Sequence, residues 1–270
     1  AASGAANTVA EIQVHLTAAD AALATIEAYN NGDGITSAAL TMQNYADAGI
    51  TGVTADNLAA VNAQVLAAAS GGADAVADIQ AHVTAADAAL ALIEAYNNGD
   101  GAALGALTAQ NYADVGITGV TADNLAAVNA QVLAAASGGA DTVAEIQGHV
   151  TAANAALATI EAYNNGDGTA PGALTAQNYA DAGVTGVSAD NLAAVNAQVL
   201  AAASSAADAV AEIQGHVTAA DAALATIEAY SNGDGTAPAA LTAQNYADAG
   251  ITGVTADNLA AVNAQVLAAA

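Results

Sequence analysis

The chain has 270 residues, of which 26 are acidic and none is Lys or Arg, so its formal net charge at pH 7 is −26. Nucleic acids and anionic membrane surfaces are therefore excluded as ordinary partners, because both are bound through basic side chains. Cysteine is absent too, so no disulfide bond stabilises the fold. The charge has to be neutralised by salt, by divalent cations or by another protein.

One segment recurs four times with a period of 67 residues. The string IEAY ends at Tyr29, Tyr96, Tyr163 and Tyr230, and the string NYAD begins at Asn44, Asn111, Asn178 and Asn245. We assign residues 1–73 to the first repeat, 74–140 to the second, 141–207 to the third and 208–270 to a truncated fourth. Tandem repeats of this length predict units that contact their neighbours. The chain begins and ends in nearly the same phase, so we expect a slice of a longer array or a subunit whose ends meet the next copy.

Each repeat opens with a predicted long helix, residues 8–30 in the first copy. Its apolar positions step by three and four residues, which is the spacing of one helical face: Val9, Ile12, Leu16, Ala19, Leu23 and Ile26. Thr8 and Glu11 form a predicted capping box, as do Thr142 and Glu145. In the second and fourth repeats we expect Asp74 and Asp208 to cap the helix instead.

The NGDG loop after each long helix is the candidate metal site. Ca²⁺ takes six to eight oxygen ligands, which an Asn- and Asp-rich loop with glycine turns offers. EF-hand spacing is not met, because Tyr29 would fall at a ligand position and no Glu closes the loop. Two interpretations stay open, a Ca²⁺ site or a plain glycine helix cap and turn. The candidate ligands are Asn31, Asp33, Asn98, Asp100, Asn165, Asp167, Asn232 and Asp234.

Two shorter helices complete the predicted repeat. Thr41 caps a short helix over 42–48, and Thr54 caps a third helix that runs to about Ala69. Leu58, Val61, Val65 and Leu66 are predicted to share one side of this third helix. Glycines then break the chain before the next long helix. The junction at 204–208 lacks those glycines, so we expect its helices to run on with little break.

These elements predict an all-α fold, a tandem array of 67-residue three-helix repeats stacked into a rod or solenoid. One repeat carries about a dozen large apolar side chains and no Phe or Trp. Domains of this size gain only a few kcal/mol from one core, so we expect repeats to bury each other's faces. No run of about 18 apolar residues is present, which predicts no membrane insertion.

The remaining polar residues suggest no chemistry. His15 follows Glu11 by four residues, which predicts an i,i+4 pair rather than a zinc site. Asp20 and Glu27 lie roughly 10 Å apart along the helix and predict a solvated stripe.

Asn62 is expected either to form an amide ladder between repeats or to face solvent. The tyrosines are predicted to pack in the core or between repeats. Nucleophile and phosphate-binding motifs are missing, so we predict that the chain is not an enzyme.

The strings NYADAGITGVTADNLAAVNAQV and DTVAEIQ resemble the tandem helical repeats of giant bacterial surface and type I-secreted adhesin-like proteins. The resemblance covers all four repeats. It implies an extracellular, cell-surface location in a calcium-rich medium and carries no defined activity. This chain departs from the family in lacking Lys and Arg altogether.

Together these observations predict a structural extracellular protein, either the shaft of a giant adhesin or the subunit of a surface filament. Its expected partners are neighbouring copies of itself, joined head-to-tail or laterally, with Ca²⁺ as the candidate cofactor. A multivalent binding module with one weak site per repeat is the alternative. Ice or mineral recognition by Ala- and Thr-rich faces is a third hypothesis, which the irregular spacing of Thr8, Thr17 and Thr25 weakens.

Overall fold

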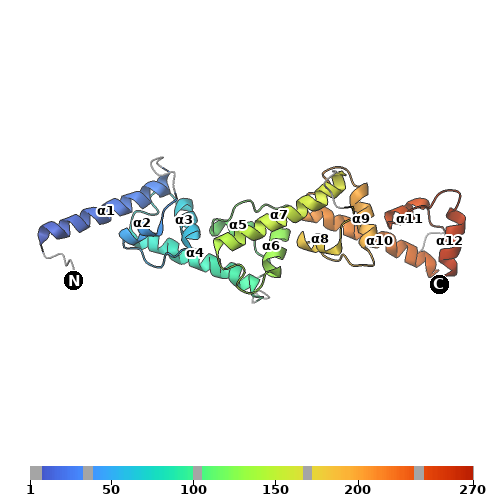
Figure 1. The fold of residues 1–270 in the computed structure, drawn as a ribbon, viewed down its shortest axis with the longest axis horizontal. Helices are drawn as coiled ribbons and strands as arrows, with labels where there is room; N and C mark the ends of the chain where they lie inside the picture. Colours follow the sequence, from blue (N-terminus) through green and yellow to red (C-terminus); the bar gives the residue numbers. More distant parts are fainter. Residues whose placement is uncertain (1–7, 33–38, 100–104, 167–171, 234–239, 270) are drawn as a thin grey trace. The chain divides into compact units, whose positions relative to one another are not determined.

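The computed structural model describes residues 8–32, 39–99, 105–166, 172–233 and 240–269, and within these ranges the chain is all-helical with no strand. Each sequence repeat contributes one long helix, one helix of six residues and one of ten residues (Figure 1). The described helices are α1 Val9–Asn31, α2 Met42–Asp47, α3 Leu58–Ala67, α4 Val76–Asn97, α5 Ala109–Asp114, α6 Leu125–Ala134, α7 Val143–Asn165, α8 Ala176–Asp181, α9 Leu192–Ala201, α10 Val210–Ser231, α11 Ala243–Asp248 and α12 Leu259–Ala268.

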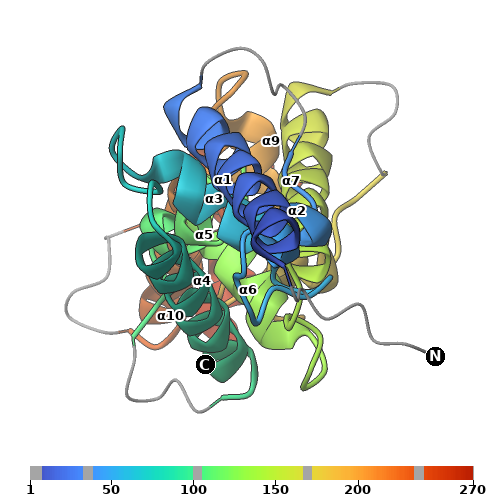
Figure 2. The ribbon, with the colours of Figure 1, turned by 90° about the vertical axis from the view of Figure 1, so that its left-hand side faces the viewer.

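The chain divides into two compact units, Ala1–Val120 with Val132–Gly148, and Thr121–Gln131 with His149–Ala270. In the first unit α1 contacts α2 and α3, and α3 also contacts α4 and α5 (Figures 1 and 2). In the second unit α10 contacts α9, α11 and α12, and α9 also contacts α11. A third helix therefore packs against the long helix of the following repeat as well as elements of its own.

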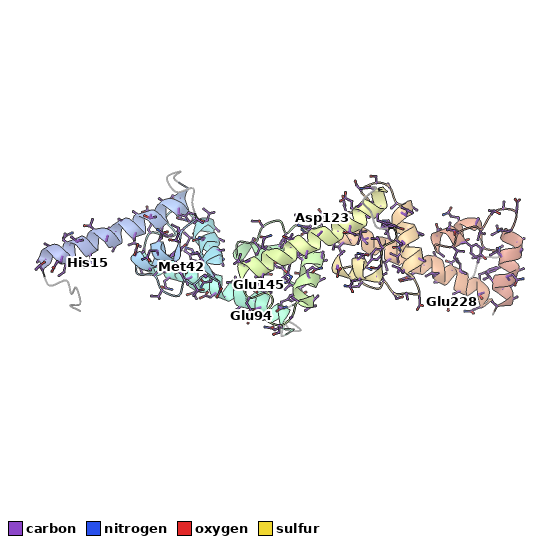
Figure 3. The ribbon with its side chains drawn as sticks, viewed as in Figure 1. His15, Met42, Glu94, Asp123, Glu145 and Glu228 are labelled. Atoms are coloured by element: carbon purple, nitrogen blue, oxygen red, sulfur yellow. The ribbon has the colours of Figure 1, made fainter. Side chains whose placement is uncertain are left out.

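The predicted start of the long helix is confirmed where a Thr-x-x-Glu box is present. Thr8 accepts a hydrogen bond from the Glu11 backbone, and the Glu11 carboxylate accepts one from the Thr8 backbone in return. Thr142 and Glu145 do the same (Glu145 is labelled in Figure 3). The predicted caps at Asp74 and Asp208 are wrong: Ala75 and Ala209 occupy the cap position and make no side-chain cap bond. Each helix begins one residue too late for the aspartate to reach the first amides.

The short helix is also confirmed, whereas the third helix starts later than predicted. Thr41 and Asn44 form a reciprocal capping box around α2. The chain makes a turn after Thr54, so that α3 begins only at Leu58, whose amide donates to the Thr54 carbonyl. Val61 and Val65 are fully buried, but Leu66 is 54% exposed, so its predicted place on the buried side is wrong.

A tyrosine and an asparagine lock the short helix to the third helix. The Tyr45 side chain is fully buried, and its hydroxyl donates to Asn62 Oδ1 at 2.7 Å. Asn62 Nδ2 donates in turn to the Leu40 carbonyl at 2.9 Å. The same bonds recur at Tyr179, Asn196 and Leu174, and at Tyr246, Asn263 and Leu241. Asn62 is therefore neither in an amide ladder nor in solvent, because a buried phenol needs a buried acceptor.

A second asparagine ties the end of the long helix to the end of the third. Asn30 Nδ2 donates to the carbonyls of Val65 and Ala68, which have no partner within α3. Asn97 and Asn164 make the equivalent pair of bonds. The Oδ1 atoms of Asn30, Asn97 and Asn164 are buried without a partner. In the fourth repeat Ser231 stands at this position and keeps the donation, to the Val266 carbonyl.

The junction at 204–208 breaks the helices as firmly as the others, so the prediction of continuous helices is wrong. α9 ends at Ala201 and α10 begins at Val210. Ser205 adopts a φ of 64°, the left-handed conformation that Gly71 and Gly138 adopt in the earlier junctions. A serine in this region is strained relative to glycine, and the contacts on either side hold it there.

One described helix, Val76–Asn97, is long and apolar enough to cross a membrane by length and composition alone. A single such helix is weak evidence for a span, because buried core helices meet the same criterion. In this fold Ile79, Val83 and Ile93 of α4 are almost completely buried. The absence of membrane insertion stays a prediction.

Raising the pH above the ordinary tyrosine pKa of 10.0 should unfold the chain. Burial raises the pKa of Tyr45, Tyr112 and Tyr179, and a neighbouring tyrosine raises each further. A raised pKa in the folded state means that the stabilisation is complete below pH 10 and is lost as the pH rises beyond it. We expect helical circular dichroism and tyrosinate absorbance to change together in one steep step.

The alkaline titration reports on tyrosine alone, because the chain has no Lys, Arg or Cys and no other side chain ionises in this pH range. A gradual rise in tyrosinate absorbance near pH 10 for all eight tyrosines, with no loss of helix, would contradict the buried lock.

Candidate functional site: the repeat interface

The most extensive recurring contact is the one between the third helix of a repeat and the long and short helices of the next. We call this contact the repeat interface; it joins α3 to α4 and α5, and α9 to α10 and α11. Ala60, Val61 and Val65 of α3 are fully buried, as are Ile79 and Ala86 of α4. Each side is built mainly from small or β-branched residues, which let two helices approach closely while burying apolar surface.

An amide clamp closes one edge of the interface. Gln80 accepts a hydrogen bond from the Thr51 amide at 3.1 Å and donates to the Thr51 carbonyl at 2.9 Å. The side-chain amide thus replaces the backbone partner that a neighbouring strand would supply. The same pair of bonds joins Thr118 to Gln147, and Thr185 to Gln214.

A buried asparagine forms the second polar link. Asn57 accepts from the Thr54 amide, donates to the Gly52 carbonyl at 2.8 Å, and donates to Asp87 Oδ1 of the next repeat at 2.7 Å. It therefore fixes the turn of its own repeat and the position of the following long helix at once. Asn191 makes the equivalent set of bonds with Asp221.

The partner of this asparagine needs an oxygen rather than a charge. In the third repeat Asn154 replaces the aspartate, and Asn124 donates to Asn154 Oδ1 at 2.7 Å. The solvated stripe predicted at Asp20 and Glu27 is confirmed, because both residues are exposed. Asp87 and Asp221, at the phase of Asp20, are exposed as well, and each also accepts the hydrogen bond of an asparagine from the preceding repeat. Their replacement by an amide in one copy gives no reason to assign acid–base chemistry to this position.

A glutamine forms the third polar link, to the end of the next short helix. Gln64 donates to the Asp114 carbonyl at 2.6 Å, and Gln131 and Gln198 donate to the carbonyls of Asp181 and Asp248. These carbonyls lie in the last turn of the short helix, where a carbonyl has no backbone N–H partner within the helix. The bond caps the short helix from the preceding repeat.

The chain approaches itself closely at the glycines that follow α5, α8 and α11. Gly183 has a φ of 74°, and a Cβ built on it would lie 2.7 Å from the Ala126 carbonyl oxygen and 2.8 Å from Ala127 Cα. At Gly250 the Ala193 carbonyl oxygen would lie 2.5 Å away. Glycine is therefore required twice over, for the left-handed backbone and for the absence of a side chain.

Two of the histidines, His82 and His216, bond to the junction that precedes their own helix. His82 Nε2 lies 2.8 Å from the Gly72 carbonyl oxygen, and His216 Nε2 lies at the same distance from the Ala206 carbonyl oxygen. The sequence predicted an acid–imidazole pair at i,i+4, but the bond that the structure gives these two residues goes to the backbone. A carbonyl oxygen can only accept, so the ring N–H is the donor, and a structural role accounts for this position.

The predicted metal ligands are only partly within the described ranges. Asp33, Asp100, Asp167 and Asp234 lie outside them. Asn31 Oδ1 accepts a hydrogen bond from Ser70 Oγ at 2.6 Å, and Asn98 and Asn165 accept from Ser137 and Ser204 in the same way. Asn232 is the C-cap residue of α10. Three of the amide oxygens thus already hold the following junction, while the Ca²⁺ hypothesis itself stays a prediction.

No group of three or more His, Asp or Glu side chains suited to a metal ion occurs among the residues that the structure describes. In two repeats a hollow lies between the long helix and the short helix. Between α1 and α2 it has a volume of about 600 Å³ and is lined by His15, Ala18, Ala22, Asn44 and Asp47 among others. The corresponding hollow between α7 and α8 is about 400 Å³, with Gln131 of the preceding repeat in its wall.

Sequence reasoning missed the residues that carry the interface. Asn57, Gln64 and Gln80 recur at a fixed phase of every repeat, but so do many residues with no such role. The one discriminating signal was the exchange of Asp for Asn at position 154, which keeps an acceptor and discards a charge.

Substituting the interface glycine by alanine should separate backbone strain from repeat packing. Gly183→Ala and Gly49→Ala both force a side chain into a left-handed conformation, which costs about 1–2 kcal/mol. A Cβ at Gly49 meets nothing within 4 Å, whereas one at Gly183 meets the backbone of Ala126 and Ala127. We expect Gly183→Ala to lower the free energy of unfolding by a further ~1–3 kcal/mol, the usual cost of overpacking. Equal losses in chemical denaturation would show that the close approach contributes nothing.

Comparison with protein-family models, with curated proteins and with solved structures finds no match to this chain. The resemblance to adhesin-like repeats therefore stays a prediction. The function has to be argued from the repeat interface and from the charge of the chain.

Proposed function

We propose that this chain is a structural extracellular repeat protein, part of the shaft of a giant bacterial adhesin or the subunit of a cell-surface filament. The 67-residue, three-helix repeats stack as a tandem array, and each contributes length rather than chemistry. The observation that carries the proposal is the repeat interface, whose apolar and polar contacts recur at the same phase of successive repeats.

Contacts beyond the nearest neighbour support a stiff array. The Val210 amide at the start of α10 donates to the carbonyl of Asp123, two repeats earlier in the sequence, at 3.2 Å (Asp123 is labelled in Figure 3). A hinge between adjacent repeats would break this bond together with the amide clamp. Bending therefore costs several contacts at once, which is the property that a shaft needs.

The surface chemistry supports an extracellular, salt-rich setting. The net charge of −26 is spread over a chain with no basic side chain, so its self-repulsion is relieved by screening rather than by ion pairs. Trypsin-like proteases have no site to cut, since Lys and Arg are absent. Both properties suit a protein exposed outside a bacterial cell, and antibody labelling of intact cells tests that location.

The alternative is a multivalent binding module with one weak site per repeat. The hollow between the long and short helices favours it, because it recurs between α1 and α2 and between α7 and α8. Avidity would then raise the apparent affinity of four repeats far above that of two. A shaft shows no such gain when chains of two and four repeats are titrated with the same ligand. Among the described residues no observation favours ice or mineral recognition, and Thr17 and Thr25 donate their hydroxyls to their own helix backbone.

Adding repeats should lengthen the particle by a constant step. Chains of two, three and four repeats, compared by small-angle X-ray scattering, are expected to give equal increments in maximum dimension, because each added repeat docks through the same interface. Increments that shrink with each repeat, as in a flexible chain whose size grows with the square root of its length, would contradict the proposal.

Calcium should stabilise the array if the NGDG loops or the acidic surface bind it. We expect millimolar Ca²⁺ to raise the melting temperature more than NaCl of equal ionic strength, and excess chelator to reverse the rise. Asp100→Asn tests a loop ligand, and Asp114→Asn, outside the loop, is its matched control. If Ca²⁺ and NaCl act alike, screening alone explains the effect and the chain has no calcium site.

A further inference from the structure

The string AYNNGDG occurs at the end of three long helices, at residues 28–34, 95–101 and 162–168. Its second asparagine is followed by glycine, a pair that readily loses the side-chain amide, because glycine has no side chain to shield its backbone nitrogen. The local sequence is identical in the three copies, so any difference in reactivity between them has to come from the structure. The three pairs are Asn31 with Gly32, Asn98 with Gly99, and Asn165 with Gly166.

The loss of the amide begins with an attack by the glycine backbone nitrogen on the side-chain carbonyl carbon of the asparagine. The nitrogen gives up its proton and forms a bond to Cγ, the Cγ–Nδ2 bond breaks, and ammonia carries the proton away. Water then opens the resulting cyclic imide at either of its carbonyls, which gives aspartate or isoaspartate. The net reaction consumes water, releases ammonia and converts a neutral amide into a carboxylate.

The folded backbone keeps the two reacting atoms apart. Asn98 has a ψ of −1°, which places the Gly99 nitrogen beside the backbone nitrogen of Asn98 instead of beside its Cβ, where ring closure needs it. The Gly99 N–H also donates to the Tyr96 carbonyl at 3.3 Å, and this bond makes the nitrogen harder to deprotonate. Gly32 and Gly166 donate to the corresponding tyrosine carbonyls at the same distance. All three glycines are exposed, so water reaches the nitrogen once these bonds open.

A serine from the junction after the third helix holds each asparagine side chain as well. Ser70 Oγ donates to Asn31 Oδ1 at 2.6 Å. The carboxamide cannot turn toward the Gly32 nitrogen without breaking this bond. Ring closure therefore requires the end of the long helix to open away from the junction first. The equivalent bonds join Ser137 to Asn98 and Ser204 to Asn165.

We propose that Asn31, Asn98 and Asn165 are sites of spontaneous deamidation, and that the serine bonded to each one sets its rate. Each asparagine reacts from the opened helix end and is protected while the serine bond is closed. The reaction needs only the chemistry of this helix end, so it is expected whether the chain is a shaft or a binding module.

Deamidation damages the helix end at which it occurs. The new carboxylate lies at the C-terminal end of a helix, where the helix dipole favours positive charge. It also adds to a net charge of −26 in a chain with no Lys or Arg to pair with it. Isoaspartate carries an additional backbone carbon, which displaces the glycine from the carbonyls that it caps, those of Ala28 and Tyr29 in the first repeat. A protein that is not replaced therefore loses its helix caps with age.

Removal of one serine from the full chain tests this control of the rate. The wild type and Ser70→Ala are incubated in mildly alkaline buffer and digested with a glutamate-specific protease, since trypsin has no site to cut. Tandem mass spectrometry of the peptides gives the deamidated fraction at each asparagine. We expect Ser70→Ala to speed deamidation of Asn31 by about two- to tenfold, the factor by which loss of one typical hydrogen bond raises the open population. Asn98 and Asn165 keep their serines and should react at the wild-type rate.

Two further variants separate the serine bond from general loosening. Ser70→Thr keeps a hydroxyl and should keep the wild-type rate at Asn31. Thr17→Ala removes an exposed hydroxyl that donates to the Gln13 carbonyl within α1, and it should leave all three rates unchanged. In urea the three asparagines should react at one common rate that exceeds every folded rate, because their local sequences are identical.

An unchanged or lower rate at Asn31 in Ser70→Ala would overturn the proposal. A lower rate would mean that the hydroxyl polarises the amide carbonyl and promotes the attack. An equal rise at all three asparagines would indicate general loosening and would likewise reject the serine bond as the control, as would a Ser70→Thr chain that reacts as fast as Ser70→Ala. Equal rates in urea and in the folded chain would show that the fold gives no protection.

Discussion

The rest of the structure depends on the third helix of the repeat, because α3 and α9 are each shared between two successive repeats. In the first unit α3 packs on α1 of its own repeat and on α4 and α5 of the next. Its Ala60, Val61 and Val65 are fully buried by this arrangement. A ten-residue helix of mostly small side chains buries too little surface to stabilise a repeat from one side alone. Packing against two repeats makes the same residues serve two cores.

Much of the helical pattern was predictable from local sequence. The three-four spacing of Val9 to Ile26 and the boxes at Thr8 and Thr41 act within one helical turn, so a single stretch of chain contains the whole signal. The late start of α3 was not predictable, because Thr54 has the chemistry of a cap and only the bond from Asn57 to Asp87 in the next repeat shows why a turn comes first. The exposure of Leu66 was not predictable either, because the side of α3 that is buried depends on its packing against helices of two repeats.

The candidate site was harder to predict than the helices. Its links join residues about 30 and 50 positions apart, such as Asn57 with Asp87 and Gln64 with Asp114. Neither hydrophobic periodicity nor residue type reports on such distances. The NGDG loops drew attention because acidic and glycine-rich stretches suggest metals, yet the described part of the loop, Asn31, is engaged in holding Ser70. Repetition marks a position as constrained without saying whether the constraint is chemical or structural.

The absence of Lys and Arg explains why amides carry nearly all of the specificity. The carbonyl and carboxylate oxygens of these contacts still need donors, and with no Lys or Arg those donors have to be Asn, Gln, Ser, Thr, Tyr and His side chains or the backbone. Asn30, Asn57, Asn62, Gln64 and Gln80 each satisfy such a group in the first two repeats. Hydrogen bonds made by neutral Asn and Gln side chains keep their strength when salt screens charges. The repulsion between the 26 carboxylates becomes weaker under the same conditions. Salt therefore removes the main force that opposes stacking and leaves the contacts that favour it intact.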